Sequence, residues 1–268
     1  MSGTPILPGA TIGVVGGGQL GRMLAMAARR MAYRVIVLDP GENAPAAQLA
    51  DAQIRAPLDD ADAYRRLAEQ SDVITLEWEN ASSEILRPLQ ELTPIRPGPH
   101  VLQVAQHRLR EKDEARRLGL PTAEYRTVRS RADLQAAIAA IGTPAVLKTC
   151  EGGYDGKGQV VIRDAAEAAD AFEELGSGSQ ELILEGWVDF RMEASVICAR
   201  NEAGEVVCFP VSENIHRDGI LDLTVAPARI SPALARQAQE IGDAMVEGLA
   251  LIGILAVALF IDQKDRLY

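Results

Sequence analysis

The stretch Gly152-Gly153-Tyr154-Asp155-Gly156-Lys157-Gly158-Gln159 decides the fold of this chain. It contains four glycines and lies between two apolar, β-branched runs, 145–149 and 160–163, which predict two strands. Glycine backbones can present several N–H groups to phosphate oxygens without obstruction by side chains. A P-loop would need a helix after its glycines and a Gly-Lys-Ser/Thr ending, and the sequence offers neither. The pattern therefore predicts either a flexible hairpin or one that covers phosphates, with Lys148 and Lys157 as positive charges.

Composition restricts the class of protein. The chain has 268 residues, is 47% hydrophobic and 24% charged, and is long enough for two domains or a divided single one. Its net charge of −11 argues against a nucleic-acid surface but leaves room for a local basic pocket. The sequence contains no apolar run of roughly 18 residues, and residues 1–10 carry no basic segment, so we expect neither a membrane span nor a secretory signal.

The three cysteines, Cys150, Cys198 and Cys208, do not have metal-ligand spacing. Cys198 and Cys208 are expected on neighbouring strands of one hairpin. Each is interpreted as a small buried hydrophobe rather than as half of a disulfide. These features together predict a cytoplasmic protein.

The N-terminal region begins with a βαβ pattern. A strand over 12–15 leads into Gly16, Gly18 and Gly21, which fit G-x-G-x-x-G, and a strand over 35–38 ends at Asp39. Alone this predicts a dinucleotide enzyme, but the same glycines serve any close strand-to-helix turn. A further strand over 72–76 is followed by Glu77, which is either a substrate contact or a solvated loop acid.

A helix is predicted over 101–118, with Arg108 and Lys112 one turn apart on its polar face. Residues 182–188 form an apolar strand that runs into a hinge, where backbone groups of Trp187 and Val188 could read an adenine edge. Glu193 begins the next strand and would otherwise be an edge acid. His216 is placed in a polar loop, and residues 253–261 are predicted as a buried strand.

Three motifs point to one family. Lys148 with the glycine stretch, the run Gln19-Leu20-Gly21-Arg22-Met23, and Asn214-x-His216 followed by Gly-Ile-Leu resemble the N5-carboxyaminoimidazole ribonucleotide synthases, which are ATP-grasp ligases. The resemblance covers nearly the whole chain. It implies an α/β fold with a doubly wound N-terminal domain over 1–116 that binds a ribonucleotide. An ATP-grasp lid over 117–186 and an incomplete C-terminal ATP-grasp subdomain over 187–268 would follow.

The resemblance also implies an activity. ATP would drive the carboxylation of 5-aminoimidazole ribonucleotide by bicarbonate, through carboxyphosphate, in purine biosynthesis, in a homodimeric cytoplasmic enzyme that uses Mg²⁺. Carried over to this sequence, the catalytic residues would be Lys148, Tyr154, Asp155 and Lys157, and the ribonucleotide contacts Gln19, Leu20 and Glu77. ATP would be bound by Arg108, Lys148, Gly153, Tyr154, Asp155, Gly156, Lys157, Gly158, Gln159, Glu185, Gly186, Trp187, Val188, Glu193 and His216.

The sequence departs from the family pattern at the expected metal site. Ala258 stands where the family has a glutamate, and the chain ends at Tyr268, before the family's Asn-Glu pair. Because Mg²⁺ needs carboxylate or phosphate oxygens, we expect this chain to bind ATP but to be inactive or impaired. Two alternatives stay open: another ATP-grasp ligase, such as a transformylase or a biotin carboxylase, and an ATP-binding module without turnover.

Overall fold

The computed structural model describes residues 5–152, 157–176 and 181–268, and it divides into two compact units. Unit 1 comprises residues 1–103, 201–205 and 251–254, and unit 2 comprises 104–200, 206–250 and 255–268. No helix among the described residues is long and apolar enough to cross a membrane. The predicted boundaries at 116 and 186 stay predictions.

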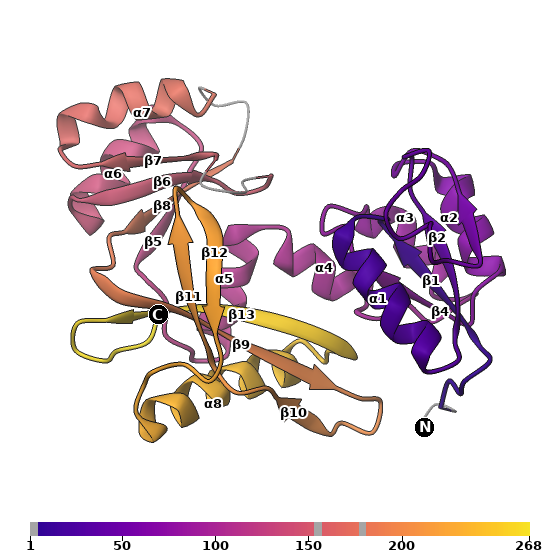
Figure 1. Cartoon of the computed structure of the whole chain (residues 1–268). Helices are drawn as coiled ribbons and strands as arrows, with labels where there is room; N and C mark the ends of the chain where they lie inside the picture. Colours follow the sequence, from indigo (N-terminus) through magenta and orange to yellow (C-terminus); the bar gives the residue numbers. More distant parts are fainter. Residues whose placement is uncertain (1–4, 153–156, 177–180) are drawn as a thin grey trace. The chain divides into compact units, whose positions relative to one another are not determined.

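Unit 1 contains a four-stranded parallel sheet in the order β3-β2-β1-β4 (Figure 1). This is the predicted doubly wound α/β arrangement. Its strands are β1 (Thr11–Val15), β2 (Arg34–Leu38), β3 (Ala52–Ile54) and β4 (Val73–Leu76), and its helices are α1 (Gln19–Arg30), α2 (Ala61–Glu69) and α3 (Ser83–Leu89).

Alternation along the strands of unit 1 separates two apolar clusters. Val14 and Val37 pack with Ala25 and Ala28 of α1. Residues that point to the opposite face pack with α2 and α3; they are Val15, Ile36, Leu38, Ile54 and Ile74. Because successive side chains of a strand point to opposite faces, the near-continuous apolar runs of β1 and β2 fill both clusters.

The helix predicted over 101–118 is two helices, α4 (Pro99–Ala105) and α5 (Arg108–Arg117). The prediction of one helix was therefore wrong. His107 between them has an extended backbone, with φ −134° and ψ 108°. Its buried ring lies 3.2 Å from the Glu181 carboxylate, measured from Nε2 to Oε2. The contact between His107 and Glu181 therefore lies at the point where the helix predicted from the spacing is interrupted.

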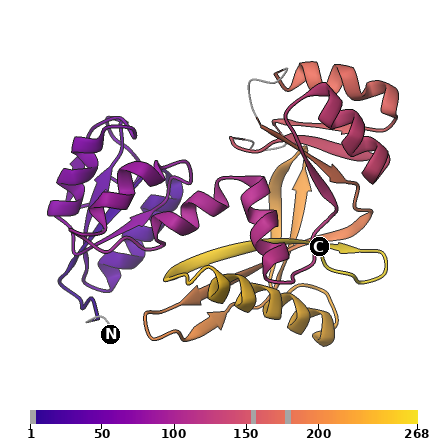
Figure 2. The same cartoon turned by 180° about the vertical axis from the view of Figure 1, so that it is seen from behind.

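The lid region of unit 2 is an antiparallel sheet in the order β5-β8-β6-β7. One face is covered by α6 (Arg131–Ile141) and α7 (Ala168–Glu174), as Figures 1 and 2 show. Ser130 caps α6, because its side chain accepts a hydrogen bond from the Asp133 amide. The strands are β5 (Tyr125–Val128), β6 (Ala145–Thr149), β7 (Gln159–Ile162) and β8 (Leu182–Gly186), and a 3₁₀ turn, Ala165–Glu167, precedes α7.

The rest of unit 2 is a five-stranded sheet in the order β10-β9-β11-β12, with β13 also paired to β9. Helix α8 (Pro232–Gly248), capped by the side chain of Ser231, packs on β9 and β10. At Gly242 an added Cβ would lie 2.6 Å from Cys198 Sγ, so this close approach requires a glycine. The strands are β9 (Phe190–Arg200), β10 (Val206–Cys208), β11 (Ser212–Arg217), β12 (Ile220–Val225) and β13 (Gly253–Asp262).

Strand β13 corrects the prediction that residues 253–261 are a buried strand. It pairs with β9, and its side chains alternate between covered and exposed positions. Ile254 is 60% exposed, and Ala256 and Ala258 are also exposed. An apolar run of this length is compatible with full burial, but only the pairing partner and the covering elements decide which face is buried.

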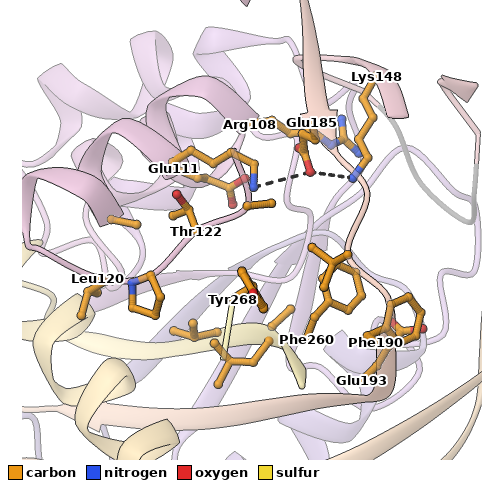
Figure 3. A pocket seen from close by; sticks show the side chains of 18 of the residues that line it. Arg108, Glu111, Leu120, Thr122, Lys148, Glu185, Phe190, Glu193, Phe260 and Tyr268 are labelled. Carbon is orange, nitrogen blue, oxygen red and sulfur yellow. Dashed lines mark hydrogen bonds and ion pairs between the residues drawn. The ribbon is translucent and has the colours of Figure 1, made fainter. Parts of the chain in front are cut away.

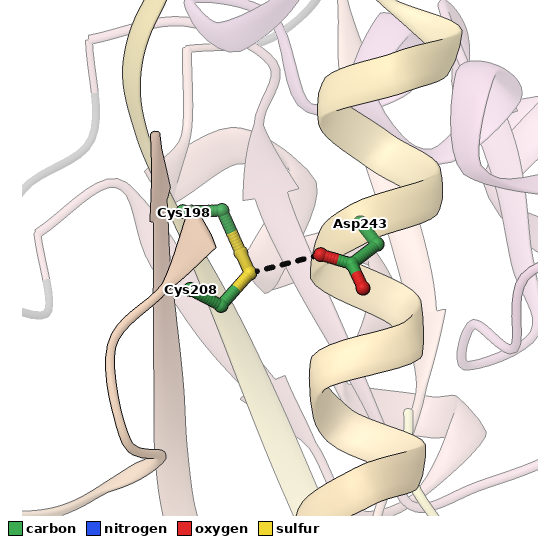
Figure 4. The surroundings of a disulfide bond; sticks show 3 residues. All are labelled: Cys198, Cys208 and Asp243. Carbon is green, nitrogen blue, oxygen red and sulfur yellow. Dashed lines mark hydrogen bonds between the residues drawn. A yellow bond between two sulfur atoms is a disulfide. The ribbon is translucent and has the colours of Figure 1, made fainter. Parts of the chain in front are cut away.

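Cys198 and Cys208 correct a third prediction, because they are joined in a disulfide (Figure 4). They are directly paired across β9 and β10, as expected for neighbouring strands of one hairpin. Asp243 Oδ1 lies 3.1 Å from Cys208 Sγ. Burial, followed by Glu247 and Glu240, raises the pKa of Asp243. A disulfide sulfur carries no proton, so only a protonated Asp243 could donate a hydrogen bond in this contact.

The cysteine arrangement predicts a thiol count. The denatured, unreduced chain is expected to react with one equivalent of a thiol reagent, at Cys150, the free and buried cysteine. After reduction the count should rise to three, the number of cysteines in the sequence. A Cys150→Ser variant serves as the control, and it should give no reaction before reduction. Three reactive thiols in the unreduced chain would show that the disulfide does not form.

Candidate functional site

A cavity of about 710 Å³ lies within unit 2, and its volume is in the range of small-molecule sites. It is formed by α5, by the face of the lid sheet opposite α6 and α7, and by β9, β11 and β13 (Figure 3). The structure brings the following predicted ATP residues to its wall: Arg108, Lys148, Gln159, Glu185, Gly186, Trp187, Val188, Glu193 and His216.

The most buried charges in the cavity form a triad. Glu185 Oε2 lies 3.0 Å from Lys148 Nζ and 3.5 Å from Lys112 Nζ. The pairing of Val146 with Glu185 sets Lys148 diagonally across from Glu185 on the same face of the lid sheet. Lys112 comes from α5, one turn after Arg108. The triad carries one excess positive charge, which suits an anionic ligand.

Electrostatics explains how Glu185 can be buried. Burial by itself raises the pKa of the Glu185 carboxyl. The ammonium groups of Lys148 and Lys112 together lower this pKa by more than burial raises it, so the net shift is downward. Burial lowers the pKa of Lys112, and Lys148 adds to this, while Glu185 opposes it. Glu185 therefore stays ionised and holds both cations.

Arg108, which the family resemblance assigned to ATP, stands at the first position of α5. Its backbone N–H donates to the Cys150 carbonyl at 2.9 Å, and its Nη1 donates to the Thr149 carbonyl at 2.6 Å. Both bonds tie α5 to the end of β6. Arg108, Lys112 and Lys148 thus bring three cationic side chains to one end of the cavity.

The glycine stretch lies only partly within the described structure. Gly153, Tyr154, Asp155 and Gly156 lie outside the described residues, so their predicted contacts stay predictions. Lys157 and Gly158 form the turn before β7. Gly158 has φ +71°, a conformation that favours glycine, and its carbonyl accepts from the Thr149 amide at 2.9 Å. Strand, turn and strand are therefore present as predicted.

The hinge after β8 lines the cavity with Gly186, Trp187 and Val188. The Trp187 amide donates to the Pro144 carbonyl at 3.3 Å, and the Val188 carbonyl accepts from the Phe190 amide at 3.0 Å. A base that used the Trp187 N–H would have to replace this bond, so adenine reading by that group stays a prediction.

Glu193 and His216 meet in the cavity, with Glu193 Oε2 3.1 Å from His216 Nδ1. His216 lies on strand β11, where the pairing with β12 shifts register between Ile215 and His216. The prediction that it stands in a polar loop was wrong. The polar residues that suggested a loop occupy a hairpin that turns at Asp218 and Gly219, both with positive φ.

Sequence reasoning missed two features of this site. Lys112 was placed one turn after Arg108 on the polar face of a helix, but no role in the site was assigned to it. Phe190 and Phe260 stack with ring centroids 4.5 Å apart and also line the cavity. They come from β9 and β13, so only the pairing of these strands brings the rings together.

The described residues do not present a carboxylate set suited to Mg²⁺ in this cavity. Strand β13 contributes only apolar residues to the wall, at 255–260, including Ala258. In the part of the chain that the structure describes, three carboxylates line the cavity: Glu185 is engaged by two lysines, Glu193 is engaged by His216, and Glu111 is exposed on α5. Among the described residues these three do not form a group close enough to share a metal ion. Mg²⁺ requires oxygen ligands, so no chemical step is assigned to a metal held by these residues.

The predicted ribonucleotide contacts belong to unit 1. Gln19 begins α1, Leu20 is 59% exposed, and Glu77 follows β4. At Gly16, φ is +94° and an added Cβ would lie 2.3 Å from Glu77 Oε2, so the carboxylate sits directly on the glycine turn. Asp39 accepts from the Gly17 amide at 2.8 Å. Asp39 stands after the second strand of the βαβ unit, where a ribose-binding acid is found in dinucleotide enzymes. In this structure it supports the glycine turn.

Comparison with known proteins identifies two domain types in this chain. A ribonucleotide synthetase preATP-grasp domain model matches residues 9–106, and an ATP-grasp domain model matches 113–268. The N5-carboxyaminoimidazole ribonucleotide synthase of Bacillus subtilis strain 168 is 42% identical over 267 residues, which are 100% of this chain and 70% of that protein.

Two solved structures are similar to the whole chain. An ADP complex of an N5-carboxyaminoimidazole ribonucleotide synthetase is 46% identical, with a TM-score of 0.93, covering 98% of this chain and 69% of the other. The Aspergillus clavatus N5-carboxyaminoimidazole synthase with ADP and 5-aminoimidazole ribonucleotide is 30% identical, with a TM-score of 0.90 and coverages of 98% and 69%.

Proposed function

Because this chain belongs to the N5-carboxyaminoimidazole ribonucleotide synthase family of ATP-grasp ligases, we propose that it binds ATP in the cavity of unit 2. We propose further that it carries the family's ATP-dependent carboxylation of 5-aminoimidazole ribonucleotide. The observation that carries the proposal is the convergence of Arg108, Lys112 and Lys148 on one end of a cavity whose other walls are largely apolar. A triphosphate suits the cationic end, and a base suits the walls around Trp187 and Phe190.

The reaction requires activation of a poor electrophile. An oxygen of bicarbonate would attack the γ-phosphorus of ATP, and the bond to the ADP oxygen would break, which gives carboxyphosphate. The amine of 5-aminoimidazole ribonucleotide would then attack the carboxyl carbon, and phosphate would leave with the proton that the amine nitrogen loses. Catalysis of such steps consists mainly of positioning and of neutralising phosphate charge. We assign this neutralisation to Arg108, Lys148 and Lys157, and water exclusion to the glycine stretch. Tyr154 and Asp155 would lie at the junction of ATP and ribonucleotide.

The remaining assignments are proposals of the same kind. Gln19, Leu20 and Glu77 would contact the ribonucleotide, because Glu77 stands at the carboxyl end of β4, where ligands of open α/β sheets bind. Glu193 would bind the ribose hydroxyls of ATP, and His216 would be a further ATP contact. Mg²⁺ as cofactor, a homodimeric state and a cytoplasmic location are proposed from the family. The net charge of −11 supports the absence of a nucleic-acid partner.

One observation favours nucleotide binding with little or no turnover as a second candidate function. The wall formed by β13 is apolar at Ala258, where the family pattern has a glutamate. The interaction that a glutamate would make at position 258 would act on the transition state of phosphoryl transfer, and Ala258 cannot make it. Turnover should therefore suffer more than nucleotide affinity.

Calorimetric titration with ADP is expected to show one binding site per chain. A parallel assay of phosphate release, with ATP, Mg²⁺ and bicarbonate, with and without 5-aminoimidazole ribonucleotide, measures turnover. Release that depends on the ribonucleotide would establish the ligase, and binding without such release would establish the second candidate. Absence of ADP binding by the folded chain would exclude both.

A further inference from the structure

We propose that Lys112 is a positioning residue that holds the Glu185 carboxylate, so that Lys148 can turn from Glu185 to a nucleotide phosphate. The inference rests on the proposed ATP site and adds a residue that the sequence motifs did not assign. Its basis is that two ammonium groups approach the same oxygen, Glu185 Oε2, at 3.0 Å and 3.5 Å.

The shorter of the two contacts involves the lysine that the ligand needs. Lys148 Nζ donates to Glu185 Oε2 at 3.0 Å, so a phosphate that recruits Lys148 competes with this hydrogen bond. A buried carboxylate that lost its only cation would be left uncompensated, which is costly in a poorly solvated site. The side chain of Glu185 is 8% exposed, so water offers little compensation. A second cation removes this penalty.

Lys112 is placed to remain with Glu185 throughout. It projects from α5, which is tied to the end of β6 through the Arg108 backbone and side chain. Its ammonium lies 5.9 Å from the centroid of the Tyr125 ring, a favourable cation–π distance. The Tyr125 hydroxyl donates to Asp113 at 2.6 Å, which fixes the ring. The Lys112 side chain is 21% exposed.

The charges around the triad are consistent with this exchange. Burial lowers the pKa of Lys112, and the nearby Lys148 cation lowers it further, while Glu185 and then Glu111 raise it. Departure of Lys148 toward a phosphate would remove a repulsive neighbour from Lys112. The attraction between Lys112 and Glu185 would then be opposed by less positive charge. Ligand binding and the Lys112–Glu185 pair therefore support each other.

The inference predicts an epistatic pattern in ADP affinity. Lys112→Met is expected to raise the Kd for ADP about tenfold, which corresponds to about 1.4 kcal/mol, because Lys148 is then the only cation of Glu185. Adding Glu185→Gln to Lys112→Met should recover most of this loss, since a neutral amide does not retain Lys148. Lys112→Arg, which keeps the charge, should stay within about twofold of the wild type, far below one tenfold step.

Arg116→Met is the matched control. Arg116 lies on the same helix and over the same Tyr125 ring, at 4.0 Å, but it pairs with Glu124 and does not reach Glu185. Its loss should leave the Kd unchanged. Circular dichroism melts establish that each variant is folded before titration.

The outcomes separate this inference from the proposed function. Wild-type protein that fails to bind ADP overturns the ATP site itself. If the wild type binds and Lys112→Met is not weakened, the positioning role is wrong. If Lys112→Met is weakened and Glu185→Gln does not recover the loss, Lys112 acts on the ligand directly or only through the fold, and the inference is also overturned.

Discussion

Replacing Lys148 with alanine is expected to weaken ADP binding by roughly 30-fold or more, because loss of one partner from a desolvated charged contact costs about 2–5 kcal/mol. Lys148 stands on β6 with 18% of its side chain exposed, and it lines the cavity beside Arg108. In the variant Glu185 keeps Lys112, so the buried carboxylate is still compensated and unit 2 should remain folded. The heat of ADP titration is the measurement, with circular dichroism as the test of folding.

Lys264→Ala is the control for this experiment. Lys264 belongs to the turn after β13, where its amide donates to Asp262, and its side chain does not line the cavity of the triad. Loss of one lysine there should leave the ADP Kd unchanged. An unaltered Kd in Lys148→Ala as well would remove Lys148 from the phosphate site.

Replacing Glu185 with glutamine is expected to destabilise unit 2 by about 3 kcal/mol, the lower end of the range for breaking a buried ion pair. Two ammonium groups would then face each other without a counter-charge. The lower end applies because Lys112 and Lys148 keep 21% and 18% exposure and can recruit water. Urea unfolding followed by tryptophan fluorescence measures the change. Of the two tryptophans, Trp78 lies in unit 1, so a Trp78→Phe background leaves Trp187 as the reporter.

The pH dependence of the free energy of unfolding shows whether the Glu185 carboxylate stabilises the folded chain. The pKa of Glu185 is lowered in the folded chain from an ordinary value of 4.5. Its contribution is therefore complete above pH 4.5 and is lost as the pH falls through the lower folded value. The stability difference between wild type and Glu185→Gln should be constant near neutral pH and should shrink on acidification.

Glu193→Gln is the matched control, since Glu193 lines the same cavity but is 30% exposed and pairs with His216. Its effect on the free energy of unfolding should be about 1 kcal/mol or less, as for exposed pairs. Equal losses for the two variants, or a Glu185 effect that does not change with pH, would contradict the buried-triad interpretation.

The sequence by itself determined the elements whose signals are local. Ser130 and Ser231 cap their helices through contacts three residues ahead, which is a property of the helix end alone. Gly16 and Gly158 take positive φ at the turns where the glycine motifs predicted close backbone approach. The alternation along the lid strands places Lys148 and Glu185 on the face opposite α6 and α7. The family motifs then identified nine residues that line the cavity.

Only the tertiary structure decided the features that depend on contacts between distant segments. Helical spacing continues through residue 107, but the buried His107 beside Glu181 divides α4 from α5. Pairing of β13 with β9 brings Phe260 onto Phe190, and pairing of β10 with β9 brings Cys208 to Cys198. In the sequence Lys112 has the features of an ordinary surface lysine. Only the packing of α5 against the lid sheet brings it to Glu185. Periodicity specifies which face of an element is apolar, whereas the partner that covers this face is chosen by packing across long stretches of chain.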